Sequence, residues 1–259
     1  MTSRTTLQLT ENLRRIRDRI ESACARAGRT TCDVTLVAVT KYAELDWVRE
    51  LVDLGITDLG ESRPQQLVSR AAQLPAHVRW HLIGHLQRNK VESILPVVAQ
   101  IHSADSVRLI EAISKEAQKL GLRPHVLLSE RGGVSPPAES VQRSGLYPRV
   151  LLEVNVSGEK SKDGFDPVDM LAAWPSILRQ ESIAIEGLMT MAPIGDNVES
   201  ARPVFRTLRV LRDRMVAASD GQCPLPDLSM GMSGDFEIAI EEGATLIRIG
   251  SSLFEGLVP

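Results

Sequence analysis

Residues 34–59 read VTLVAVTKYAELDWVRELVDLGITDL, and this stretch carries the pattern that decides the fold. The unbroken apolar run 34–39, rich in β-branched residues, is typical of a strand buried on both faces. Residues 44–54 predict an amphipathic helix that ends before Gly55, and a second strand follows near 57–59. A strand, a helix and a further strand form one unit of a parallel α/β fold.

The same unit recurs along the rest of the chain. Strands are predicted at 34–39, 57–59, 78–83, 99–102, 149–155, 183–188, 226–229 and 245–249. Helices are predicted between them at 44–54, 63–73, 87–95, 106–120, 167–178, 198–218 and 234–242. This pattern favours a closed (β/α)8 TIM-type barrel. An open doubly wound sheet is the alternative, but no GxGxxG motif follows the first strand.

Two segments stand outside this repeating unit. Apolar residues recur at helical spacing from Leu9 to Ala27, and they predict an extra N-terminal helix that ends at Gly28. Residues 122–148 mix Pro, Gly and Ser without a clear period, which indicates a surface insertion before the fifth strand. Residues 1–259 are therefore expected to form a single barrel domain.

Composition excludes several classes of partner. The formal net charge is −3, which gives no electrostatic basis for binding nucleic acid or an anionic membrane. The N-terminus lacks the apolar run of a signal peptide or a membrane span. Cys24, Cys32 and Cys223 have no CxxC spacing and fit reduced thiols. We expect a cytoplasmic protein.

Lys41 is the first candidate for chemistry. It follows the apolar strand 34–39 at its carboxyl end, where barrel enzymes build their sites. Desolvation there would disfavour the ammonium form and leave an amine that can form a Schiff base with an aldehyde. The alternative is a lysine that extends from the strand end into solvent.

Two segments rich in Gly and Ser follow the seventh and eighth predicted strands, and each is expected to open a helix. They are 229–235 (SMGMSGD) and 250–252 (GSS). Such segments offer backbone N–H groups and hydroxyls to an anion, and many barrels bind phosphate after these two strands. Ordinary turns with N-cap serines are the alternative. The candidate residues are Met232, Ser233, Gly250 and Ser251.

Three further polar residues lie at strand ends. Arg248 lies within the apolar strand 245–249, so its guanidinium needs a partner: a cofactor's nitrogen or phosphate, or a core carboxylate. Asn155 ends the fifth strand, where it either contacts a ligand or caps the turn. His81 ends the third strand and is spaced four residues from His85, but without Cys or Asp ligands nearby no metal is expected.

Segments in a fixed order resemble the pyridoxal-phosphate homeostasis protein family, which is similar to the N-terminal barrel domain of alanine racemases. They are VAVTK (37–41), GITDLGESRPQQ (55–66), WHLIGHLQRNK (80–90), IHSADS (101–106), LLEVNVSGEKSKDGF (151–165), GLMTMAP (187–193) and LSMGMSGDFEIAIEEGATLIRIGSSLFEG (228–256). The match extends from about residue 34 to 256, apart from 122–148.

The resemblance implies that the barrel binds pyridoxal 5′-phosphate (PLP), with Lys41 as the Schiff-base lysine. Ser233, Gly250 and Ser251 match the phosphate-binding positions, and Arg248 matches the arginine that faces the pyridine nitrogen. Ser62 stands where the family usually has Asn, so a side-chain contact to PLP there is in question.

The function that the resemblance implies is a carrier rather than a catalyst, because a second base is missing.

 Racemisation needs Lys41 on one face of the substrate carbon and a second acid or base on the other. Two-domain racemases draw that group from a further domain, whereas this sequence ends at Pro259, directly after the barrel. Tyr42 is expected to point away from the barrel mouth, because side chains alternate along a strand. His81 then remains as the candidate second base and cofactor contact.

We therefore expect a monomeric carrier that stores PLP and delivers it to apo PLP-dependent enzymes, without substantial turnover and with no catalytic residue. A PLP-dependent amino-acid racemase is the first alternative. A Schiff-base aldolase acting on a phosphosugar is the second, because a lysine and a phosphate site would serve it equally well.

Overall fold

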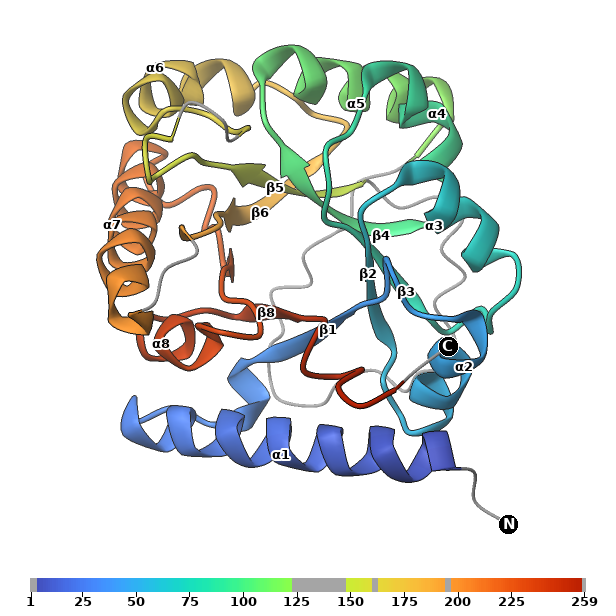
Figure 1. Cartoon of the computed structure of the whole chain (residues 1–259). Coiled ribbons are helices and arrows are strands. Elements are labelled where there is room, and N and C mark those ends of the chain that lie inside the picture. The colour runs from blue at the N-terminus through green and yellow to red at the C-terminus, as the bar shows by residue number, and fades with distance from the viewer. Residues whose placement is uncertain (1–3, 123–147, 160–162, 194–196, 258–259) are drawn as a thin grey trace.

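The computed structural model describes residues 4–122, 148–159, 163–193 and 197–257, and these form a closed barrel of parallel strands (Figure 1). The strands follow one another around the barrel in sequence order. They are β1 (Thr35–Val39), β2 (Asp58–Glu61), β3 (Arg79–Leu82), β4 (Val98–Ala104), β5 (Arg149–Glu153), β6 (Ala184–Met189), β7 (Asp227–Ser229) and β8 (Leu246–Ile249). The predicted (β/α)8 barrel is confirmed.

Pairing between the first and last strands closes the barrel. β1 runs parallel to β8, with Thr35 opposite Leu246 and Ala38 opposite Ile249. An open doubly wound sheet would leave both of these strands with an unpaired edge. The short apolar runs of both strands suit this position, because a barrel strand is buried on its inner and outer faces.

Helices surround the barrel and cover the outer faces of the strands (Figure 1). They are α1 (Arg4–Arg26), α2 (Leu45–Asp53), α3 (Pro64–Ala71), α4 (Val91–Ile94), α5 (Val107–Lys119), α6 (Pro167–Ile177), α7 (Arg202–Ala218) and α8 (Phe236–Glu241). Short 3-10 helices are η1 (Thr31–Asp33), η2 (Arg88–Lys90) and η3 (Val198–Ala201). No helix within the described ranges is long and apolar enough to cross a membrane.

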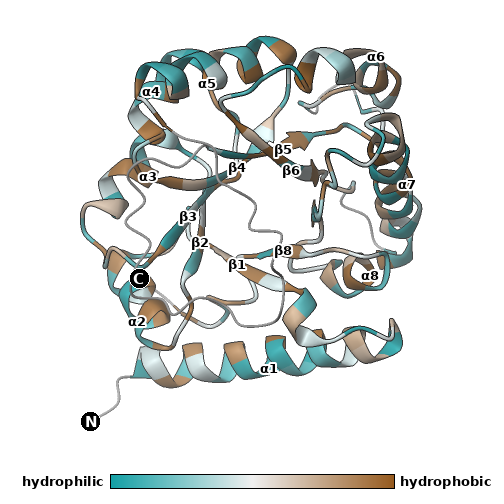
Figure 2. Cartoon of the chain, turned by 180° about the vertical axis from the view of Figure 1, so that it is seen from behind, coloured by the Kyte–Doolittle hydropathy of each residue, from teal (hydrophilic) through white to brown (hydrophobic). Residues whose placement is uncertain are grey.

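The extra N-terminal helix is present as α1. Its buried face includes Leu9, Leu13 and Ile16, and apolar segments alternate with polar ones along it in Figure 2. The guanidinium of Arg19 lies 4.4 Å from the ring centroid of Phe236 in α8. Gly28 follows α1 with a positive φ of 64°, as the predicted end of the helix requires.

The prediction of a helix after the eighth strand is wrong, because residues 251–256 form turns. Asn12, buried in α1, donates hydrogen bonds of 2.9 Å to the carbonyl oxygens of both Leu253 and Glu255. A side chain of the first helix thus satisfies carbonyl groups that a helix would have bonded internally.

The other differences concern segment ends and the insertion. The segment predicted as helix 87–95 begins as the 3-10 helix η2 before the short α4, and 198–218 begins as η3. The predicted insertion 122–148 falls between α5 and β5, and its residues 123–147 lie outside the described part of the chain.

Candidate functional site

A cavity of about 720 Å³ opens at the carboxyl ends of the strands. Its walls come from the segments that follow β1, β2, β3, β6, β7 and β8. Most residues singled out by the sequence line it, namely Lys41, Ser62, Met232, Ser233, Arg248, Gly250 and Ser251. The structure therefore gathers side chains from distant parts of the sequence around one space.

Lys41 lies in a turn rather than in the strand. β1 ends at Val39, and the backbone N–H of Ala43 donates to the carbonyl of Thr40 at 2.9 Å. Arg70 of α3 fixes this turn by donating to the carbonyl oxygens of Thr40 (2.8 Å) and Ala43 (2.6 Å). Lys41 is exposed within the cavity wall, so the desolvation expected from the sequence is not provided by the protein atoms.

Tyr42 also lines the cavity, which contradicts the expectation that it points away. The alternation of side chains holds only within a strand, and both Lys41 and Tyr42 lie beyond the end of β1. The Lys41 Nζ atom lies 5.1 Å from the centroid of the Tyr42 ring. The Tyr42 side chain is 82% exposed, so a ligand would find it on the same turn as Lys41.

The segments after β7 and β8 meet at Ser233. Its hydroxyl oxygen accepts hydrogen bonds from the backbone N–H groups of Gly250 (3.3 Å) and Ser252 (3.4 Å). The loop of Ser233 is itself closed by Asp235, whose Oδ1 accepts from the N–H of Met232 at 2.6 Å. Backbone donors and a hydroxyl thus converge on one point, as in an anion-binding nest. Because α8 is short and residues 251–256 form turns, the loops supply these donors.

Gly231 makes the first of these loops possible. It has a φ of +92°, and a Cβ atom there would lie 2.6 Å from the Cβ of Ala239 in α8. Only glycine adopts this conformation readily and leaves room for the helix. The glycine before Met232 is therefore a packing requirement that brings the loop to the cavity.

Arg248 extends from β8 to the base of the cavity and is only 4% exposed. Nη1 donates to the hydroxyl of Ser229 at 2.5 Å, and Nη2 donates to the carbonyl of Thr190 at 2.9 Å. Burial lowers the pKa of Arg248 to about 10, and the carboxylates of Asp235 and Glu153 oppose this shift. Its hydrogen-bond partners among the described residues are neutral oxygens, which leaves further N–H groups for a ligand.

Ser62 lines the cavity beside a buried carboxylate. Its backbone N–H donates to Oε1 of Glu61 at 2.8 Å. Oε2 of Glu61 has no hydrogen-bond partner among the described residues and lies 3.7 Å from Nη1 of Arg70. Burial raises the pKa of Glu61. Glu61 therefore lies beside Arg70, the residue that fixes the turn carrying Lys41.

Two candidate residues lie away from the cavity wall. Asn155 caps a turn: Nδ2 donates to the carbonyl of Glu159 at 2.8 Å, and Oδ1 accepts from the N–H of Gly158 at 3.1 Å. His81 points into the barrel interior, where it is hydrogen-bonded at 2.9 Å to both Asp58 and His102. A direct contact from either side chain to a ligand in the cavity is not part of this arrangement.

His85 lies apart from His81, at the mouth of the barrel. Its Nδ1 atom lies 3.0 Å from Asp105 and 3.7 Å from Asp163, and the ligand atoms of these three residues all lie within 4.8 Å of one another. Burial, together with the charges of Asp105 and Asp163, raises the pKa of the neighbouring Glu153 to about 7. His85 and Asp163 are both exposed, and such groups are common without a metal ion.

Sequence reasoning missed the role of Arg70. It lies on the buried face of α3 and is 8% exposed, so an arginine among the apolar positions of a predicted helix was the available signal. It also missed the cavity wall after β6, which includes Ala192, Pro193 and Asn197.

Comparison with known proteins identifies the family of this chain. Residues 9–257 match the family model of the alanine racemase N-terminal domain. A pyridoxal phosphate homeostasis protein of Aquifex aeolicus is 37% identical over 245 residues, which cover 94% of this chain and 96% of the relative. This chain belongs to the pyridoxal phosphate homeostasis protein family. Relatives from Aquifex aeolicus and Homo sapiens both carry this name.

Solved structures related to this family have the same barrel. PipY of Synechococcus elongatus, a structure with PLP bound, has 30% sequence identity and a TM-score of 0.72, covering 91% of this chain and 99% of PipY. Alanine racemase of Clostridium difficile shares the fold, with a TM-score of 0.71 and 14% identity, but this chain covers only 57% of it.

Proposed function

We propose that this member of the pyridoxal phosphate homeostasis protein family binds PLP in the cavity at the barrel mouth and acts in intracellular cofactor homeostasis. Lys41 holds PLP as a Schiff base, and the protein stores the cofactor and delivers it to apo PLP-dependent enzymes. We place it in the cytoplasm as a monomer, without substantial catalytic turnover.

The observation that carries this proposal is the convergence of three different groups on one cavity. The amine of Lys41 suits the aldehyde of PLP, and the donors around Ser233 and Gly250 suit its phosphate. The guanidinium of Arg248, which can only donate hydrogen bonds, suits an unprotonated pyridine nitrogen. The residues present therefore fit the functional groups of PLP.

When bound, PLP supplies an aldehyde and a ring that can take up negative charge. Arg248 disfavours protonation of the ring nitrogen because it is a buried cation, and this weakens the ring as an electron acceptor. Storage needs only the Schiff base and the phosphate contacts. The site is therefore better suited to holding PLP than to turnover.

An amino-acid racemase remains the second candidate, because Tyr42 lines the cavity and carries a phenol that can transfer a proton. Racemisation requires acid or base groups on opposite faces of the substrate carbon. Tyr42 and Lys41 are adjacent on one turn, with Nζ 5.1 Å from the ring centroid, which places both on the same side. This geometry favours the carrier.

The test of PLP binding is an absorbance spectrum of the purified protein after addition of PLP, followed by borohydride reduction and peptide mapping. We expect a near-visible Schiff-base band and a pyridoxyl adduct on Lys41. The Lys41→Ala variant should lose the band, whereas the control variant Lys90→Ala should keep it. An adduct mainly on another lysine would contradict the role of Lys41, whereas no band with PLP would contradict PLP binding and favour the aldolase alternative.

A further inference from the structure

A line of buried polar side chains crosses the interior of the barrel and ends at the cavity. Successive members are joined by hydrogen bonds of 2.9, 2.9, 2.8 and 2.5 Å. Each member is at most 7% exposed. In order, they are Asp58, His81, His102, Ser229 and Arg248.

The carboxylate of Asp58 fixes the direction of the first bonds. Bonds from His81 and Arg79 hold the pKa of Asp58 at about 2, against the effect of burial, so the group is an acceptor. His81 must therefore donate to Asp58 from Nε2, and in the relay its Nδ1 atom is the acceptor. His102 must then donate from Nε2 to Nδ1 of His81.

Arg248 fixes the direction at the other end. A guanidinium only donates, so the Ser229 oxygen accepts from Nη1, and the Ser229 hydroxyl hydrogen is available for Nδ1 of His102. Complete burial, with the cation of Arg248 nearby, lowers the pKa of His102, so its ring is neutral. Both ends are therefore satisfied by one arrangement, in which each histidine carries its hydrogen on Nε2.

We propose that Ser229, His102 and His81 are positioning residues that hold the Arg248 guanidinium in place through a one-way hydrogen-bond relay anchored on Asp58. The role of Arg248 toward PLP rests on the proposed function, whereas the relay itself does not. Ser229 and the carbonyl of Thr190 accept hydrogen bonds from the guanidinium. Because the group is planar, these two bonds also fix the directions of its remaining N–H groups.

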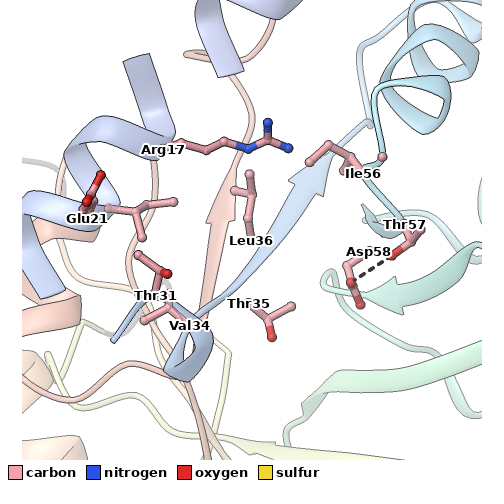
Figure 3. Close-up of a pocket in the computed structure, with 11 residues that line it drawn as sticks. Arg17, Glu21, Thr31, Val34, Thr35, Leu36, Ile56, Thr57 and Asp58 are labelled. Atoms are coloured by element: carbon pink, nitrogen blue, oxygen red, sulfur yellow. Dashed lines mark hydrogen bonds between the residues drawn. The ribbon is translucent and has the colours of Figure 1, made fainter. Parts of the chain in front are cut away.

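Asp58, the anchor of the relay, lies at the opposite end of the barrel, where β2 begins. Asp58 accepts a hydrogen bond of 2.8 Å from Nε of Arg79, and Thr57 Oγ1 lies 3.4 Å from its Oδ2. Figure 3 shows Asp58 and Thr57 beside a second cavity, of about 570 Å³, with Arg17 extending from α1 above it. The relay thus joins a carboxylate at the amino ends of the strands to a cation at their carboxyl ends.

The first experiment uses the full ligand-free chain, so that it does not depend on PLP. The chain has five histidines, and the variant H77Q/H85Q/H125Q retains only His81 and His102. Nitrogen-15 NMR of the labelled side chains should show two neutral rings, each with its hydrogen on Nε2. A hydrogen on Nδ1 of either ring, or a doubly protonated His81 at neutral pH, would overturn the relay.

The second experiment breaks the relay in that background. Asp58→Asn replaces the carboxylate by an amide that can donate or accept, so His81 and His102 should lose their single tautomers and show mixtures. The control Ser219→Ala, which removes a buried hydroxyl outside the relay at the end of α7, should leave both tautomers unchanged. If Asp58→Asn does not fold, the tautomers found in the first experiment decide the relay. Unchanged tautomers in the folded variant would refute the relay.

The third experiment asks whether the relay positions Arg248 for PLP. With PLP labelled at the ring nitrogen, the wild-type complex should show an unprotonated nitrogen. Ser229→Ala should bind PLP about tenfold more weakly and shift that nitrogen resonance toward the protonated form. Unchanged affinity and resonance would refute the positioning role. A wild-type chain that binds no PLP would refute the proposed function, while the tautomers still decide the relay.

Discussion

The hydroxyl oxygen of Ser233 and the backbone N–H of Gly250 are joined by a hydrogen bond of 3.3 Å. The contact ties the loop after β7 to the loop after β8, and Ser252 donates to the same oxygen. The hydroxyl occupies the point where these donors converge. An anion bound there would accept hydrogen bonds from the same N–H groups, and the Ser233 hydroxyl would rotate to donate to it.

Removing the serine hydroxyls should weaken binding of the phosphate in particular. The double variant S233A/S251A should bind PLP about 10- to 100-fold more weakly, because a hydrogen bond to a charged acceptor contributes roughly 1.5–3 kcal/mol. Binding of unphosphorylated pyridoxal should remain as in the wild type, measured by titration at equilibrium. Ser93→Ala, on the surface, is the control. Equal losses for both ligands would show that the phosphate is held elsewhere.

Replacing Gly231 should destabilise the fold. Gly231→Ala combines a positive φ with a Cβ atom only 2.6 Å from that of Ala239, so the free energy of unfolding should fall by about 2–4 kcal/mol. Gly234→Ala in the same loop is the matched control, since nothing lies within 4 Å of its added Cβ. Urea unfolding measures both variants. Similar losses in the two would contradict the role assigned to Gly231.

Glu153 should make stability depend on pH. Burial and the charges of Asp105 and Asp163 raise its pKa from 4.5 to about 7, so the folded state binds more protons than the unfolded state between these values. The free energy of unfolding should therefore fall as the pH rises through this window. Glu153→Gln removes the titrating group, so the variant should not show this fall. Between pH 4 and pH 8, its free energy of unfolding should therefore rise relative to that of the wild type by at most about 3 kcal/mol.

The measurement is urea unfolding of both proteins across that pH range. Glu181→Gln, at an exposed position, is the control and should show no such trend relative to the wild type. A stability difference between Glu153→Gln and the wild type that does not change with pH would contradict the raised pKa.

The holo-protein should turn over no amino acid at a useful rate. Incubation with single enantiomers of alanine and serine in deuterated water should give no inversion over many site equivalents, because Lys41 and Tyr42 share one turn and His81 is buried in the relay. Exchange of the α-hydrogen without inversion would indicate Lys41 acting alone. Inversion at multiple turnovers would contradict the carrier, and loss of it in Tyr42→Phe would identify the second base.

The strands and most of the cavity could be predicted because each depends on a local pattern. The apolar runs of β1 and β8 indicate buried strands, and Lys41 and Arg248 are conspicuous within or directly after them. The barrel order then brings both residues to one end. Segment ends were less accurate, since side chains distant in sequence set them, as Asn12 does for residues 253 and 255.

The orientation of individual side chains could not be predicted in the same way. Tyr42 lines the cavity because Arg70, from α3 beyond the next strand, fixes the turn after β1. His81 and His102 meet only because β3 and β4 are neighbours with both side chains directed inward. Neither contact leaves a periodic signal in the sequence.

Closure of the barrel through β1 and β8 also determines when the site can exist during synthesis. β1 is among the first strands to leave the ribosome, and its partner β8 is the last. Lys41 emerges more than two hundred residues ahead of Arg248 and of the Gly250 loop. Until β8 has been synthesised, a nascent chain therefore exposes the unpaired edge of β1 and has no complete cavity, so cofactor can be captured only after that.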